Sequence, residues 1–192
     1  MADQTQPDAV ALLKADHRKA EELFASFESA RGAERKQRLV QQICAELTVH
    51  TMIEEEIFYP ACKGAVEEDL LSEAYVEHDG AKVLIAELLG SAPDEAFYDA
   101  KVKVLSEMIE HHVHEEEMRS EGMFSQARAA GLDMDALGEQ MRARKSELMA
   151  RFETEGLPPP ETRTFAGHDL VEGGPVDEDP ETAERPAGSP RA

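Results

Sequence analysis

Apolar residues recur at steps of three and four along most of the chain, which is the spacing of one face of a helix. Four such stripes precede residue 120, and each carries a histidine among its apolar positions. Between them lie "RGAE", "YPACKG" and "GSAPDE", whose glycines and prolines are typical of helix ends. The pattern predicts four helices joined by three short turns, with the second helix ending at the Tyr-Pro of residues 59–60.

The chain after "AAGLD" follows two other patterns. A fifth amphipathic stretch has one apolar side, formed by Leu137, Met141, Leu148 and Phe152. From residue 156 onward proline, glycine and acidic residues dominate, so this tail cannot bury enough apolar surface to offset the entropy of ordering. We therefore expect three parts, namely a helical bundle over residues 8–130, an amphipathic helix over 131–155 and a disordered acidic tail over 156–192.

Charge and composition limit the partners of such a bundle. The net charge of −21 over 192 residues argues against a basic surface for nucleic acid or anionic lipid. The acidic, polar start shows no signal peptide, and no apolar run approaches the length of a membrane helix, so we expect a cytoplasmic protein. Cys44 and Cys62 are predicted to lie too far apart along a helix for a disulfide.

The two halves of the predicted bundle are similar in sequence. "DHRKAEELF" around His17 returns as "EHDGAKVLI" around His78, and "HTMIEE" at His50 returns as "HVHEEE" at His112. The midpoints between successive histidines fall in or beside the three predicted turns. Antiparallel helices therefore bring all four histidines to about the same height in an all-α, up-down-up-down four-helix bundle.

Two glutamates belong to the same level of the bundle. Glu54 and Glu116 follow His50 and His112 by four residues, which places each beside its histidine on one helix face. Buried polar side chains without partners are costly, and two divalent metals would satisfy them, with two histidines each and bridging glutamates. Imidazole with carboxylate suits iron, manganese or zinc, and bundle cores favour di-iron sites. The predicted metal ligands are His17, His50, Glu54, His78, His112 and Glu116.

The register of the last helix leaves an alternative open. His111 and Glu115 also fit a stripe, which runs through Val104 and Met108. The other two histidines, His114 and His168, are predicted to face solvent.

These motifs resemble the hemerythrin-like (HHE cation-binding) family across about residues 8–130. The resemblance rests on the lone His17 and His78, the H-x-x-x-E-E pairs at His50 and His112, "FYP" and "HHVHEEE". It implies a four-helix bundle with a non-haem di-iron centre and prefers His112 over His111. Where relatives soon continue with a Phe-Pro, this chain has "MRSEGMFSQAR", a short insertion without the proline.

One position departs from the oxygen-carrying members of that family. They have a further histidine one turn after the third-helix ligand, and here that residue is Lys82. We expect this lysine to extend to water at the bundle edge and leave a position on the metal open. The reduced centre should then oxidise in air to a ferric, oxo- or hydroxo-bridged pair of iron ions instead of binding oxygen reversibly.

Three functions are compatible with this scaffold. The first is a di-iron protein that binds or reacts with O2, peroxide or NO as its small-molecule ligand, in sensing or in oxidative and nitrosative stress defence. The second is an iron donor for iron–sulfur cluster repair, although such proteins often carry a cysteine-bearing N-terminal domain, which we do not expect here. The third is a metal-stabilised interaction module. The sequence names no protein partner and does not decide whether the protein is an enzyme.

Overall fold

The computed structural model describes residues 6–165, and these residues form helices without strands. Along the chain these are α1 (Ala9–Ser29), α2 (Ala33–Ile53), the π-helix η1 (Glu54–Phe58), α3 (Tyr59–Cys62), α4 (Glu68–Gly90), α5 (Tyr98–Glu117), α6 (Met123–Ala129) and α7 (Met134–Glu155).

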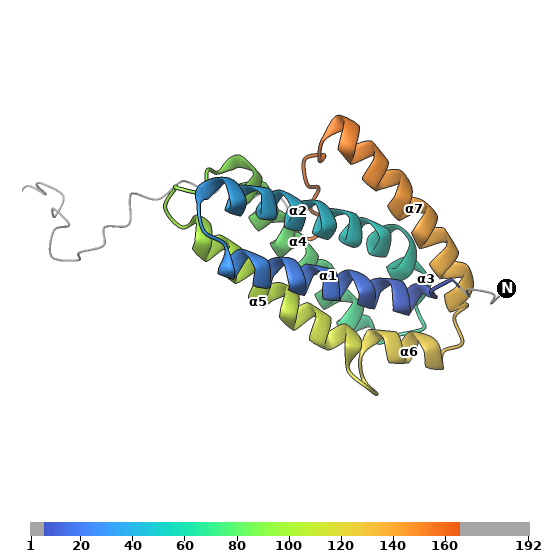
Figure 1. Cartoon of the computed structure of the whole chain (residues 1–192). Helices are drawn as coiled ribbons and strands as arrows, with labels where there is room; N and C mark the ends of the chain where they lie inside the picture. Colours follow the sequence, from blue (N-terminus) through green and yellow to red (C-terminus); the bar gives the residue numbers. More distant parts are fainter. Residues whose placement is uncertain (1–5, 166–192) are drawn as a thin grey trace, which may run out of the picture.

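Helices α1, α2, α4 and α5 form an antiparallel four-helix bundle (Figure 1). Helix α1 packs on α2, α2 on α4, α4 on α5, and α5 back on α1. The connecting segments at residues 30–32, 63–67 and 91–97 coincide with the three predicted turns. The predicted four-helix bundle is therefore confirmed. In the described residues no helix combines the length and the apolar character needed to cross a bilayer.

The core of the bundle is divided into two apolar clusters with a polar layer between them. One cluster holds the start of α1, the end of α2 and the start of α4, and includes Leu13, Ile53 and Leu71. The other holds the opposite ends of these helices and the apolar side of α5, including Phe24 and Leu105. The histidines of α1, α2 and α4 lie where one cluster gives way to the other, and His112 of α5 lies between Ile109 and Val113 at the end of the second cluster. Burial of the two clusters thus fixes the height of the polar layer.

A π-helical turn interrupts the second bundle helix. The backbone N–H of Tyr59 donates to the carbonyl of Glu54, five residues earlier. Pro60 follows directly, and it lacks the N–H that the carbonyl of Glu56 would accept in an α-helix. The helix continues as α3 to Cys62, so the prediction that Tyr-Pro ends it was wrong. Turns of this kind occur frequently at functional sites.

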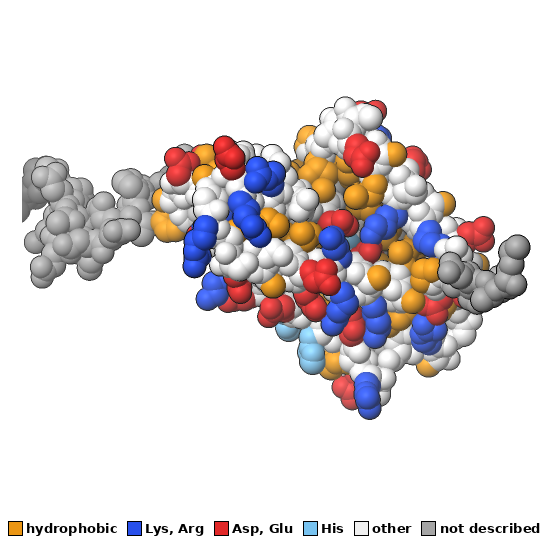
Figure 2. Space-filling model, viewed as in Figure 1, with side chains coloured by type: hydrophobic (Ala, Val, Ile, Leu, Met, Phe, Trp, Pro, Cys, Tyr) orange, Lys and Arg blue, Asp and Glu red, His pale blue; other side chains and the backbone are white. Residues whose placement is uncertain are grey.

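Helix α7 confirms the fifth predicted helix and packs across α1 and α2. A Cβ at Gly138 would lie 2.7 Å from the backbone nitrogen of Ala9, so glycine permits the close approach to the start of α1. Basic residues of α7 pair with acids on the bundle, as Arg144 does with Glu56. Figure 2 shows this mixture of acidic and basic side chains on one face.

Residues 156–165 leave the end of α7 and return to the bundle (Figure 1). Thr164 and Arg163 make hydrogen bonds to Asp79 of α4. The prediction of disorder was therefore wrong for this part of the tail, because composition does not reveal bonds to a partner far along the chain. The rest of the predicted tail, residues 166–192, lies outside the described residues.

Candidate metal centre

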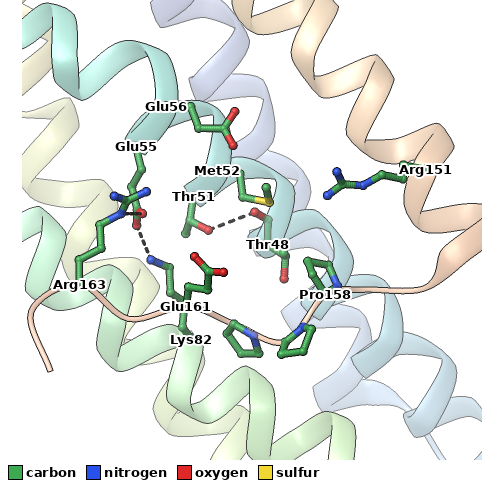
Figure 3. A pocket seen from close by; sticks show the side chains of 12 residues that line it. Thr48, Thr51, Met52, Glu55, Glu56, Lys82, Arg151, Pro158, Glu161 and Arg163 are labelled. Carbon is green, nitrogen blue, oxygen red and sulfur yellow. Dashed lines mark hydrogen bonds and ion pairs between the residues drawn. The ribbon is translucent and has the colours of Figure 1, made fainter. Parts of the chain in front are cut away.

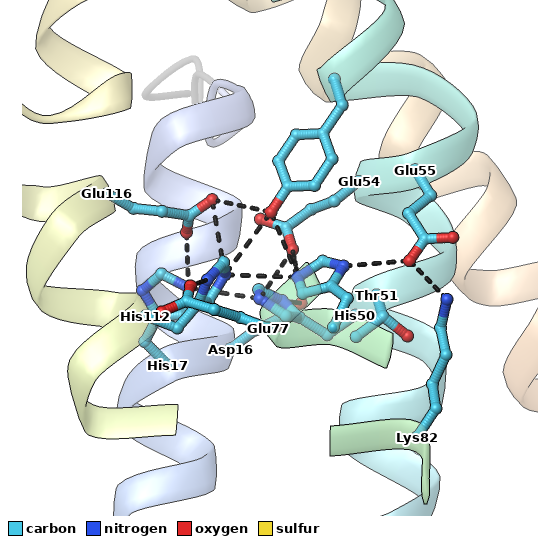
Figure 4. Close-up of polar contacts among 12 residues, drawn as sticks. Asp16, His17, His50, Thr51, Glu54, Glu55, Glu77, Lys82, His112 and Glu116 are labelled. Atoms are coloured by element: carbon cyan, nitrogen blue, oxygen red, sulfur yellow. Dashed lines mark hydrogen bonds and ion pairs between the residues drawn. The ribbon is translucent and has the colours of Figure 1, made fainter. Parts of the chain in front are cut away.

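The six predicted ligands meet in the polar layer at the middle of the bundle. His17 comes from α1, His50 from α2, His78 from α4 and His112 from α5. Each of the six side chains belongs to a residue that is at most 6% exposed. In Figure 4 the carboxylates of the two glutamates extend from different helices toward each other beside the imidazoles. The structure therefore brings together His17, His50, Glu54, His78, His112 and Glu116.

The histidines form two pairs through their Nε2 atoms. The Nε2 atoms of His17 and His50 are 3.2 Å apart, and those of His78 and His112 are 3.3 Å apart. Glu54 Oε2 lies 3.1 Å from Nε2 of His50 and 3.3 Å from Nε2 of His78. Glu54 thus reaches one histidine of each pair.

Glu116 makes the equivalent connection between the other two histidines. Its Oε2 lies 3.3 Å from Nε2 of His17, and its Oε1 lies 3.6 Å from Nε2 of His112. The two carboxylates together join both histidine pairs. Among the buried residues that the structure describes, candidate ligand atoms form two groups, and the atoms of each group lie within 4.8 Å of one another. One group includes His17 and His50, the other His78 and His112, and Glu54 belongs to both.

A carboxylate lies behind each imidazole, on its Nδ1 side. The Nδ1 atoms of His17, His78 and His112 lie 2.8, 3.1 and 2.7 Å from carboxylate oxygens. Nδ1 of His50 lies farther from its carboxylate, at 3.7 Å. Such contacts fix the tautomer and orient a histidine that binds a metal through its other nitrogen. In the order of the histidines along the chain, the carboxylates are Glu117, Asp16, Glu55 and Glu77.

The burial of the side chains on the last helix favours His112 and Glu116 over the alternative pair, His111 and Glu115. His112 and Glu116 are buried in the centre, whereas the His111 side chain is 60% exposed. His111 lies on the outside of α5, where its Nε2 is 3.4 Å from Glu115. His114 is exposed as predicted, and His168 lies outside the described residues.

Tyr59 is a member of the site that sequence reasoning missed. Its hydroxyl donates to Glu116 Oε1 at 3.2 Å and lies 3.1 Å from Nε2 of His78. A regular helical repeat four residues after Glu54 places Phe58 inward, but the π-turn adds one residue to the repeat and directs Tyr59 toward the centre as well. The "FYP" motif was the available signal, since the proline favours such an irregularity.

Lys82 does not behave as predicted. It is only 8% exposed, and its Nζ donates to Glu55 at 2.6 Å and to Asp79 at 3.2 Å. Two carboxylates inside the bundle edge replace water as its partners, so the expectation that it extends to solvent was wrong. It contributes to the site through the carboxylate behind His78.

The pKa values of the two central glutamates are shifted in opposite directions, and those of two of the histidines are lowered. Burial raises the pKa of Glu54 well above its ordinary value, and the charge of Glu116 raises it further. Burial acts in the same direction on Glu116, but the charge of His112 and contact with His17 lower its pKa to about 2. Burial also lowers the pKa of His50, and that of His78 to about 4, which keeps both imidazoles neutral as ligands at pH 7.

The buried carboxylates fit a bound cation. Within the described residues neither oxygen of Glu54 makes a hydrogen bond, although Glu54 is fully buried, and Oε2 of Glu116 makes none either. A buried carboxylate without a partner is costly, and a metal ion would satisfy these oxygens together with the Nε2 atoms around them. The donor set of imidazoles and carboxylates suits iron, manganese or zinc.

The fold and this cluster define a helical bundle with a buried histidine and glutamate metal-binding site. The family model described as "Hemerythrin HHE cation binding domain" matches residues 8–124, and the chain belongs to this family. The resemblance found from the motifs is thereby confirmed. The individual metal ligands stay a prediction.

Two relatives extend the comparison. A hemerythrin HHE cation-binding domain-containing protein from Mycobacterium kansasii has a similar structure, with a TM-score of 0.64 and 23% identity over 79% of this chain and 95% of that chain. This likeness supports the fold. A protein described as a DNA nickase from Nostoc sp. is 27% identical over 106 residues, which cover 55% of this chain. The match spans only 30% of that longer protein.

Proposed function

We propose that this chain is a non-haem di-iron protein that binds or reacts with O2, peroxide or NO, in sensing or stress defence. The observation that carries the proposal is the position of Glu54 and Glu116, each of which contacts one histidine of both pairs. His17 and His50 would hold one iron, His78 and His112 the other, and the carboxylates would bridge them. This arrangement is typical of dinuclear sites in helical bundles.

Iron in this site would supply electrons and a Lewis acid for small oxidants. Each iron would have two histidines and at most two bridging carboxylates from the protein. Iron commonly accepts up to six donors, so positions would remain for a small ligand. The four histidines border a cavity of about 10 Å³, which is about the space of one water molecule. This small space is compatible with small ligands.

Tyr59 would supply a hydrogen-bond donor inside the site. Burial raises its pKa well above the ordinary value, so the phenol keeps its proton at neutral pH. The hydroxyl holds that proton 3.2 Å from Glu116 Oε1, next to both histidines of one pair. It can therefore donate a hydrogen bond within a site from which other residues exclude water, since Phe124 of α6 stacks over His17 and contacts Phe58.

The burial of the ligands distinguishes this proposal from its alternatives. An iron donor must release its metal, whereas all six candidate ligands here lie inside the bundle at 6% exposure or less. Retention of iron is the simpler expectation. DNA nicking is not transferred from the Nostoc relative, because the match covers under a third of that protein and the net charge of −21 disfavours contact with phosphates.

The test begins with anaerobic purification and metal analysis. We expect two iron ions per chain, and oxidation to a stable ferric spectrum when O2, hydrogen peroxide or an NO donor is added. The matched variant is Glu54→Gln, which keeps the size of the side chain and removes its charge. We expect this variant to bind less iron than the wild type. Zinc in place of iron would contradict the proposal. Repeated return to the reduced spectrum after removal of O2 would identify an oxygen carrier instead.

A further inference from the structure

The segment after α7 is tied to the bundle at Asp79 on α4. One carboxylate oxygen of Asp79 accepts hydrogen bonds from the backbone N–H groups of Arg163 and Thr164, at 2.7 and 2.5 Å, and from the Thr164 hydroxyl at 2.8 Å. Asp79 is fully buried and neighbours His78 in sequence. Three donors on one charged acceptor form a strong attachment.

This attachment places Arg163 against the carboxylate behind His78. The Nε of Arg163 donates to Glu55 Oε2 at 2.9 Å, while Lys82 donates to Oε1 of the same carboxylate at 2.6 Å. Figure 3 shows both cationic side chains reaching toward Glu55. Oε1 of Glu55 also lies 3.1 Å from Nδ1 of His78. A chain of contacts therefore runs from Arg163 through Glu55 to an imidazole of the candidate metal centre.

Polar bonds, more than apolar packing, hold this segment in place. A cavity of about 220 Å³ lies between its three prolines, Pro158–Pro160, and the side chains of Thr48 and Met52 on α2. Arg151 of α7 lines the same cavity but does not contact Glu55 in the described structure. Because the segment is not tightly packed along this stretch, its specific contact with the centre is the one through Arg163.

We propose that Arg163 is a positioning residue of the metal centre, which acts from beyond the family-matched residues 8–124 by fixing Glu55 and, through it, the orientation of His78. Two cations on opposite oxygens hold the Glu55 carboxylate in one orientation. Glu55 in turn holds the proton on Nδ1 of His78, and the Nε2 lone pair then faces the centre. The positive charge of Arg163 also reduces electron donation by Glu55, which favours the reduced metal.

The first test uses the full-length metal-depleted protein and is independent of which metal binds. The 15N-histidine NMR spectrum should contain an Nδ1 proton of His78 in slow exchange with water, identified by its loss in His78→Gln. In Arg163→Ala this proton should exchange at least about tenfold faster, and Arg163→Lys should restore part of the protection. Arg151→Ala, which removes the same charge from the same cavity, should leave the exchange rate unchanged.

The second test uses iron-loaded protein and rests on the proposed function. We expect Arg163→Ala to lose Fe2+ to a chelator about tenfold faster than wild type, and to shift its reduction potential downward. Asp79→Asn, which weakens the attachment of the same segment and also the contact with Lys82, should have at least as large an effect. Adding Arg163→Ala to Asp79→Asn should add little, because the arginine is then already loosened. Circular dichroism checks that each variant remains helical.

The outcomes separate the two proposals. Wild-type exchange and wild-type iron loss in folded Arg163→Ala would show that the segment only covers the surface, and would overturn the positioning role. If the wild type holds no iron while the His78 proton still depends on Arg163, the positioning role stands and the di-iron proposal fails.

Discussion

Glu55 and Glu77 perform the same task in different surroundings. Each carboxylate contacts the Nδ1 atom of one histidine of the same pair. Glu55 contacts His78, and Glu77 contacts His112. The Glu55 side chain is 5% exposed and is paired with Lys82 and Arg163. Glu77 is 15% exposed, and among residues 6–165 it pairs with no lysine or arginine. One carboxylate is thus neutralised by cations, and the other is not.

The two histidines of this pair also differ in the direction of their pKa shifts. Burial lowers the pKa of His78 to about 4 and outweighs the contact with Glu55. Burial also opposes protonation of His112, but the charges of Glu116 and Glu77 raise its pKa above the ordinary value. The outer carboxylates therefore act on each imidazole together with burial and, for His112, with the charge of Glu116.

Replacement of Glu55 or Glu77 by alanine should show the largest difference between the two sides, in the free energy of unfolding. Glu55→Ala leaves Lys82 buried without its main partner, so we expect the free energy of unfolding to fall by about 3–5 kcal/mol. Glu77→Ala removes a hydrogen bond but leaves no lysine or arginine without its partner, and should cost about 1 kcal/mol. Urea denaturation of the metal-depleted wild type and of both metal-depleted variants measures these changes in the free energy of unfolding. Equal losses would mean that the cations do not distinguish the two sides.

Acid should weaken the contacts on the Glu55 side. The contacts with His78 and Lys82 lower the pKa of Glu55 to about 2, against burial, and the bonds from Thr164 and Arg163 do the same for Asp79. Both values lie below the ordinary values of 4.5 and 3.8. This stabilisation is therefore complete above about pH 4.5 and is lost as the pH falls toward 2.

The melting temperature of metal-depleted protein between pH 6 and pH 3 checks this expectation. It should fall more steeply for wild type than for Glu55→Gln, which has no carboxylate to protonate at this position. Parallel curves would contradict the assignment of the acid-sensitive contacts to this side.

The smallest effect is expected at His111, beside Glu77. Its side chain is 60% exposed, so His111→Ala should change the free energy of unfolding by less than about 0.5 kcal/mol and leave bound iron unchanged. His112→Ala, one residue away, should lower bound iron well below two ions per chain. Metal analysis of the two purified variants compares them directly, and iron loss in His111→Ala would restore the alternative register.

The bundle and the six central residues could be predicted because their pattern is regular. Apolar stripes fix which helix faces turn inward, and turns at the sequence midpoints fix the common height of the four histidines. Tyr59 escaped prediction because the π-turn shifts the helical repeat by one residue. A 3.6-residue pattern cannot represent such a shift.

The C-terminal contacts were beyond sequence reasoning for another reason. Arg163 reaches Glu55 across 108 positions of the chain, and no periodic pattern connects them. The composition of the segment suggested disorder, but three donors to the single buried carboxylate of Asp79 hold it. Lys82 was misplaced for the same reason, since its partners depend on how η1 and α4 pack.

Anomalous diffraction at the iron edge, from crystals of the iron-loaded chain, tests the central claim most directly. We expect two peaks in the polar layer, one beside His17 and His50 and the other beside His78 and His112, with Glu54 between them. A single peak, or a peak at the exposed group of Glu77, His111 and Glu115 in place of the buried centre, would contradict this account.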